Sequence, residues 1–150
     1  MIRPQPQLLA LGATAPALVL QSIEGDRIDA LATAAHHNLV VQFFDAQCDT
    51  CARQAAQLCS VAQRHSADTV VAVDAAGEST AVVSDYARAN RPSSCPVTLL
   101  LDPGLGVSRG YRAAVVPTVY VVDSNGKIAY AAVGSAGVDG LDSTLLHLGG

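Results

Sequence analysis

The stretch that decides the fold is residues 39–51, which read L-V-V-Q-F-F-D-A-Q-C-D-T-C. Its first six residues are almost entirely aliphatic or aromatic, a pattern typical of a strand buried on both faces of a sheet. Residues 52–64 follow with Ala, Gln and Leu, which favour a helix. Cys48 and Cys51 therefore lie where a buried strand is followed by a helix.

This placement gives the two cysteines their chemistry. The unpaired N–H groups and the positive dipole end at the start of a helix stabilise a thiolate. A spacing of two residues brings the two sulfurs within bonding reach. We therefore expect Cys48 to be the exposed nucleophile and Cys51 the more buried thiol that resolves a mixed disulfide.

Two other readings of the pair are a half zinc site and a purely structural disulfide. A structural zinc site takes four ligands, and the sequence has no second Cys-x-x-Cys and no His-x₃₋₅-His pair. The strand-to-helix position favours redox chemistry over a static disulfide, so we expect no metal here.

The rest of the chain alternates strands and helices. The predicted strands are residues 18–20, 27–30, 69–75, 97–101, 119–122 and 128–131. The predicted helices are residues 79–90, residues 106–111 and a last helix that begins at Asp142 or Ser143. Turn signals join the first two and the last two of these strands into hairpins. Since no repeat or linker divides the sequence, we expect one α/β domain over residues 1–150, a mixed sheet with helices on both faces.

Composition and charge exclude several classes of protein. Of 150 residues, 50% are hydrophobic and 15% charged, which excludes a disordered chain. The net charge of −4, without a basic cluster, argues against a nucleic-acid or anionic-membrane partner. No apolar run approaches the ~18–20 residues of a membrane span. The N-terminal segment is too short in apolar residues for a convincing leader, so the sequence indicates a cytoplasmic protein unless a leader has been removed.

A second motif lies well beyond the cysteine pair. Residues 115–123 read V-V-P-T-V-Y-V-V-D, followed by Gly126-Lys127-Ile128. This motif resembles the "V-P-T … I-D … G-K-I" segment of thioredoxin-like proteins. The opening at residues 12–20 and the helix and strand in residues 76–102 are also similar to the TlpA/ResA-type thiol–disulfide oxidoreductases. These belong to the AhpC/TSA–redoxin superfamily, and the resemblance covers nearly the whole chain.

The resemblance implies a thioredoxin-like fold with an N-terminal β-hairpin and an inserted helix–strand segment. It also implies that Cys48 attacks, that Cys51 resolves, and that Pro117 is a cis-proline beside them. The Val116 backbone would then pair with an extended substrate segment, and Gln47 would lie on the same binding surface. No metal or organic cofactor is implied. The implied partners are a protein disulfide or dithiol and an upstream electron donor, the implied state is a monomer, and the implied location is extracytoplasmic (periplasmic) if a leader was removed.

The sequence departs from the family pattern around the cysteines. Gln47 stands where the family usually has Trp. Gln42 stands where thioredoxins bury a carboxylate, and an amide cannot act as a general base. Asp45 and Asp49 add two negative charges near Cys48 that oppose its thiolate. Because a less stabilised thiolate means a less stabilised reduced form, we expect the protein to act as a reductant.

Two other functions remain open. A thiol-dependent peroxidase of the thiol-specific antioxidant type usually carries Thr three residues before its peroxidatic cysteine. Here Asp45 precedes Cys48 by three, and Cys48 itself precedes Cys51 by three. A non-catalytic binding module with a static disulfide is the third possibility.

The remaining cysteines are expected outside this chemistry. Cys59 lies eight positions after Cys51 on the predicted helix, ~12 Å along the axis and out of bonding reach of it. We expect Cys59 to be a core residue. Cys95 is expected on a loop that enters a strand, with a role as a further redox thiol as the alternative.

Overall fold

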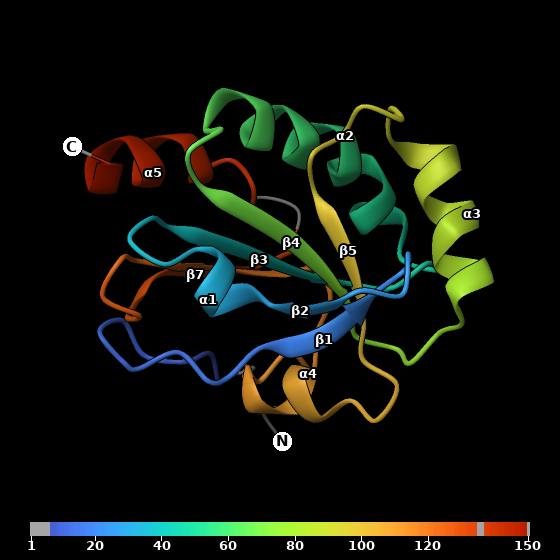
Figure 1. Ribbon diagram of the computed structural model, residues 1–150, viewed down its shortest axis with the longest axis horizontal. Helices are drawn as coiled ribbons and strands as arrows, with labels where there is room; N and C mark the ends of the chain where they lie inside the picture. The colour runs from blue at the N-terminus through green and yellow to red at the C-terminus, as the bar shows by residue number, and fades with distance from the viewer. Residues whose placement is uncertain (1–6, 135–136, 150) are drawn as a thin grey trace, which may run out of the picture.

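The computed structural model describes residues 7–134 and 137–149, and in this part of the chain seven strands form one mixed sheet (Figure 1). The strands are β1 (Val19–Ser22), β2 (Arg27–Asp29), β3 (Leu39–Phe44), β4 (Thr69–Asp74), β5 (Thr98–Leu101), β6 (Thr118–Val122) and β7 (Ile128–Val133). The helices are α1 (Ala30–Thr33), α2 (Asp49–Arg64), α3 (Thr80–Asn90), α4 (Gly106–Gly110) and α5 (Leu141–Gly149). The α/β fold class predicted from the sequence is confirmed.

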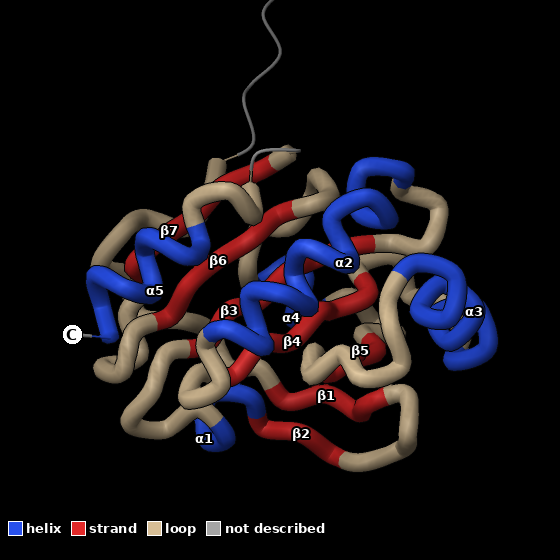
Figure 2. The backbone as a smooth tube through the Cα atoms, turned by 90° about the horizontal axis from the view of Figure 1, so that it is seen from above, coloured by secondary structure: helices blue, strands red, loops and turns tan. Residues whose placement is uncertain are grey.

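The strand order β2-β1-β5-β4-β3-β6-β7 brings the two sequence motifs to one edge of the sheet (Figure 2). Strand β4 is parallel to both β3 and β5, whereas β6 is antiparallel to β3. Phe43 near the end of β3 is paired with Thr118 at the start of β6. The segment that follows β3, with Cys48, and the segment that precedes β6, with Pro117, therefore leave the sheet at the same edge.

Helices cover both faces of the sheet. Helices α2, α3 and α5 lie over one face, and α1 and α4 lie over the other (Figure 1). Alternate residues of β3 belong to two separate core clusters: Val40 and Phe44 pack beneath α2, while Val41 and Phe43 pack with Tyr111 on the opposite side. Because both faces of β3 are buried, its residues are apolar except for Gln42, as predicted from the sequence.

The predicted elements are found with small shifts at their ends. Helix α2 begins at Asp49, three residues before the predicted range 52–64, and its first turn includes Cys51. Helix α5 begins at Leu141, one or two residues earlier than the expected Asp142 or Ser143. Helix α1 was not predicted. It is a single turn, and Asp29 caps it by accepting a hydrogen bond from the Ala32 N–H at 3.2 Å.

The expectation for the other two cysteines was incomplete. Cys59 is buried, as expected, but it forms a disulfide with Cys95, with 5.2 Å between the two Cα atoms. Cys95 lies in the loop between α3 and β5, and its bond to Cys59 holds this loop against α2. Neither cysteine is a free thiol, and the crosslink ties the middle of α2 to the inserted helix–strand segment.

Candidate redox site

The Cys48–Cys51 pair forms a disulfide at the start of α2, with 5.2 Å between its Cα atoms. Cys48 is the N-cap of the helix, and its Sγ accepts a hydrogen bond from the Cys51 N–H at 3.0 Å. Cys48 is partly exposed, whereas Cys51 is completely buried. An incoming sulfur can therefore approach Cys48 and not Cys51.

The loop before Cys48 is held by two carboxylates. Asp45 Oδ1 accepts a hydrogen bond from the Gln47 N–H at 2.8 Å. From the other side, Glu78 Oε1 accepts one from the Ala46 N–H, also at 2.8 Å. Gln47 itself is exposed, immediately before the nucleophilic position. The conformation of this loop is thus fixed by the chain beyond β4 as well as by the loop itself.

The segment that carries Pro117 is the second part of the site. The Val116–Pro117 peptide bond is cis, as the resemblance implied. Val116 is partly buried and packs against the same core cluster as Cys48, while Val115 is 40% exposed. The hydroxyl of Thr118 donates to the Val115 carbonyl at 2.5 Å. The predicted site residues Cys48, Cys51, Val116, Pro117 and Gln47 thus lie at one edge of the sheet.

The model of the AhpC/TSA family matches residues 11–131 of the chain. The chain belongs to this family. The match begins at the opening segment and ends in β7, so it includes both the Cys48–Cys51 disulfide and the Pro117 segment. No curated protein sequence matches the chain.

Solved structures show the same fold. A Chlorobium tepidum protein assigned as thiol:disulfide interchange protein DsbE is 24% identical, with a TM-score of 0.80, over 95% of this chain and 99% of that one. A secreted Mycobacterium tuberculosis disulfide oxidoreductase, described as homologous to E. coli DsbE, is 18% identical, with a TM-score of 0.73, over 87% and 96% of the two chains. With the Cys-x-x-Cys disulfide at the start of α2, the expectation of a thioredoxin-like thiol–disulfide oxidoreductase of the AhpC/TSA family is confirmed.

Two further findings concern membrane-spanning helices and metal sites in the described residues. No helix among them is long and apolar enough to cross a membrane. In the same part of the chain, no group of three or more His, Cys, Asp and Glu side chains is placed to hold a metal ion.

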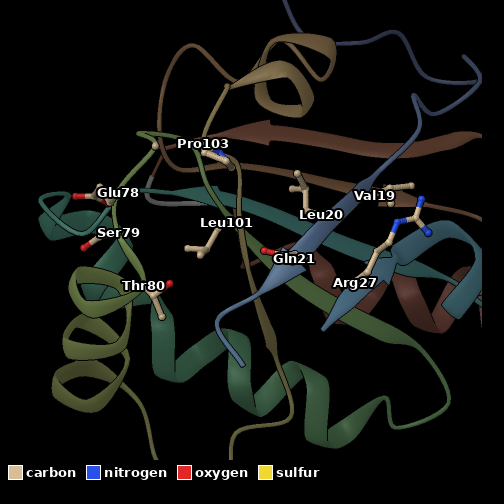
Figure 3. Close-up of a pocket in the computed structure, with 10 residues that line it drawn as sticks. Val19, Leu20, Gln21, Arg27, Glu78, Ser79, Thr80, Leu101 and Pro103 are labelled. Atoms are coloured by element: carbon tan, nitrogen blue, oxygen red, sulfur yellow. The ribbon is translucent and has the colours of Figure 1, made fainter. Parts of the chain in front are cut away.

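Sequence reasoning missed a pair of carboxyl groups behind the Cys48 loop. Asp74, at the end of β4, is completely buried and accepts hydrogen bonds from the N–H groups of Ala76, at 3.1 Å, and Glu78, at 2.5 Å. Burial, together with the hydrogen bond and charge of Glu78, raises the pKa of Asp74 to about 6 against the opposing effect of the backbone donors. Figure 3 shows that the Glu78 side chain points away from the hollow lined by Leu20, Gln21 and Leu101. Asp74 thus orders the turn that delivers Glu78 to the Ala46 N–H.

The buried Asp74 predicts a measurable pH dependence of stability. Its folded pKa lies above its ordinary value of 3.8, so folding favours the protonated form. The stability it contributes is complete below about pH 4 and is lost as the pH rises through about 6. Relative to an Asp74→Asn variant, the parent should lose on the order of 1–3 kcal/mol of unfolding free energy between pH 4 and 7. Urea unfolding across this range measures the difference. The control is Asp85→Asn, which removes an exposed carboxylate on α3, and the difference in unfolding free energy between it and the parent should not change with pH.

A network of neutral amides lies under the disulfide, also unforeseen. Gln42 Nε2 in β3 donates to Gln54 Oε1 in α2 at 3.2 Å, and Gln54 Nε2 donates to the Gly134 carbonyl at 3.1 Å. The Gly134 N–H then donates to the Pro117 carbonyl at 2.9 Å. Both glutamine side chains are buried. The network joins α2, β3 and the Pro117 segment without an ionisable group, in line with the expectation that Gln42 supplies no general base.

The signal that could have identified Gln54 is its position. It lies three residues after Cys51, on the face of α2 that carries the buried residues Cys51, Ala55 and Leu58. A buried polar side chain requires a hydrogen-bond partner, so a glutamine on the apolar face of a helix indicates a polar contact with the sheet beneath.

Proposed function

We propose that the chain reduces disulfides in protein substrates through Cys48 and Cys51. The observation that carries the proposal is the difference in exposure between the partly exposed Cys48, at the N-cap of α2, and the fully buried Cys51. At a helix start the unpaired N–H groups stabilise a thiolate, so Cys48 is suited to attack and Cys51 to resolve.

The exchange proceeds in two displacements. The Cys48 thiolate attacks one sulfur of the substrate disulfide, forming a mixed disulfide and releasing the other substrate sulfur as a thiolate. The Cys51 thiol, losing its proton, then attacks Cys48 Sγ, which breaks the mixed disulfide and releases the second substrate thiolate. Two electrons pass to the substrate, and Cys48 and Cys51 end as the disulfide. A dithiol partner, the upstream electron donor, returns the pair to the reduced state by the reverse steps.

Val116, Pro117 and Gln47 are proposed to bind the substrate beside Cys48. Proline has no N–H group, and an exposed loop of main chain next to a dithiol can pair with an extended peptide in the manner of an added strand. The partial exposure of Val116 and the exposure of Gln47 support this assignment.

The direction of transfer is proposed to be reduction of the substrate, because Asp45 and Asp49 place negative charge around Cys48. Asp45 is held in the loop by the Gln47 N–H, and Asp49 is the first residue of α2. An Asp45→Asn/Asp49→Asn variant should have a reduction potential less negative by about 20–100 mV, since each removed charge favours the thiolate. Equilibration with a glutathione redox buffer measures the potential. Asp85→Asn/Asp139→Asn removes the same charge from exposed sites elsewhere, and its potential should equal that of the parent; a shift of equal size in both variants would contradict the proposed local effect.

Insulin reduction measured beside peroxide consumption distinguishes this proposal from its rivals. The family match makes a thiol-dependent peroxidase the second candidate. Asp45, rather than Thr, three residues before Cys48 argues against it. Insulin reduction without peroxide consumption is the expected result. Peroxide consumption alone would overturn the proposal in favour of the peroxidase, and inactivity in both assays would favour a binding module.

An extracytoplasmic location is proposed for the protein. The Cys59–Cys95 disulfide supports it, because such crosslinks persist in oxidising compartments and are rare in the cytosol. The likeness to a Mycobacterium tuberculosis oxidoreductase that is described as secreted agrees with this location.

A further inference from the structure

A hollow of about 400 Å³ lies near the proposed substrate-binding segment, on the α4 side of the sheet. It is lined by Ala75, which follows β4, and by Arg109, Arg112, Ala113 and Ala114. The Ala75 N–H donates to the Phe44 carbonyl at 2.8 Å, at the point where β3 leads into the Cys48 loop. Ala114 is two residues before Val116. The hollow therefore borders both segments that flank the dithiol.

The two arginines give the hollow a positive charge. Both are exposed, and among the described residues neither makes an ion pair with a carboxylate. Arg109 Nη1 donates to the Gly104 carbonyl at 3.2 Å. The nearby Asp102 is buried and directs Oδ2 to the N–H and hydroxyl of Ser108, both at 2.7 Å. Two guanidinium groups are thus available to an external anion in a protein whose net charge is −4.

The backbone conformation at position 112 favours glycine, which indicates that the arginine side chain found there has a role of its own. Arg112 has φ 54°, in the left-handed region, immediately after the C-cap of α4. Its N–H donates to the Arg109 carbonyl at 3.0 Å, and the Ala113 N–H donates to the Ser108 carbonyl at 2.9 Å. These two bonds form a Schellman motif, in which the left-handed position favours glycine. A long cationic side chain occupies a position where the backbone alone would favour no side chain.

We infer that this hollow binds an acidic side chain of the protein substrate whose disulfide is attacked by Cys48. The inference rests on the proposed function. Arg112 is four residues before Val116. An extended substrate that pairs with Val116 advances about 3.3 Å per residue, so a carboxylate within about four residues of the part that pairs with Val116 can reach Arg112. Guanidinium groups bind carboxylates through two parallel hydrogen bonds, which gives the contact direction as well as charge.

The test uses three peptides that differ in one residue beside a cysteine held in a mixed disulfide with 2-mercaptoethanol. The variable residue is Glu, Gln or Lys. The reduced parent protein should reduce the Glu peptide about three- to tenfold faster than the Gln peptide, and the Lys peptide more slowly than either. The preference for Glu should shrink as salt is added, since the contact is near the surface.

Two variants separate charge recognition from folding. In Arg109→Gln/Arg112→Gly, the ratio of the Glu rate to the Gln rate should fall toward one. Because glycine suits the left-handed position, this variant should unfold at a temperature no lower than that of an Arg109→Gln variant alone. The matched control is Arg27→Gln, which removes an arginine on β2 beside another hollow (Figure 3), and it should keep the parent ratio.

Each outcome is decisive. Equal rates for the three peptides with the parent, while insulin is reduced, overturn the acidic preference and leave the proposed function standing. A parent that reduces neither insulin nor any peptide overturns both. A parent ratio that survives in Arg109→Gln/Arg112→Gly, or falls equally in Arg27→Gln, overturns the assignment to this hollow.

Discussion

A Cys51→Ser variant is expected to accumulate as a mixed disulfide with its substrate, whereas a Cys48→Ser variant is expected to form none. Cys48 is the exposed member of the pair, and Cys51, completely buried, acts only after Cys48 has been captured. Each variant should lose insulin reduction by on the order of 10³-fold or more, because each removes a reacting sulfur. Non-reducing gels and mass spectrometry of the intact conjugate measure the trapping.

The Cys48→Ser/Cys51→Ser double variant is the control, and it should trap nothing and keep the fold of the parent. Equal trapping by the two single variants would show that exposure does not determine which sulfur attacks. Trapping by Cys48→Ser alone would reverse the assignment of the two roles.

A Cys59→Ala/Cys95→Ala variant should unfold with a free energy lower than that of the parent by about 3–4 kcal/mol. The disulfide joins residues 36 positions apart, and opening a loop of this length returns considerable entropy to the unfolded chain. Alanine avoids leaving a hydroxyl group in the apolar surroundings of Cys59, which lies on the buried face of α2. Urea denaturation of the oxidised proteins measures the difference.

The same variant separates the two disulfides by function. Below its unfolding transition it should still reduce insulin, since Cys48 and Cys51 are unchanged. The control is urea denaturation of the parent in the presence of a strong reductant. Under these conditions its urea midpoint should approach that of the variant. An unchanged urea midpoint would contradict a stabilising role for the Cys59–Cys95 bond, and lost activity in the folded variant would place it in the redox chemistry.

The sequence was sufficient for the elements whose signals are local. The apolar run of β3 and the helix-forming residues after it predicted the strand-to-helix junction of the redox site, because burial on both faces removes polar residues. The predicted helix over residues 79–90 corresponds to α3, and the structure places Ser79 at the N-cap with its hydroxyl accepting from the Val82 N–H at 3.2 Å.

Contacts between distant segments were not predictable in the same way. The bond between Cys59 and Cys95 depends on how the loop before β5 crosses α2, which neither local sequence encodes. The hydrogen bond from the Ala46 N–H to Glu78 depends on β3 and β4 ending side by side, and Glu78 taken alone is typical of a solvated residue. Helix α1 is too short for its hydrophobic period to be recognised.

The interactions that hold helix α2 in place differ along its length. Its middle is bonded covalently through Cys59, and its last turn is joined to α5 where Arg64 Nη2 donates to Asp142 Oδ2 at 2.6 Å. The first turn, which carries Cys48 and Cys51, is held by hydrogen bonds and by the bond that the reaction opens and closes. The reaction therefore breaks and forms covalent bonds within one helical turn only. The hydrophobic contacts beneath the rest of α2 stay unchanged while the sulfurs exchange partners.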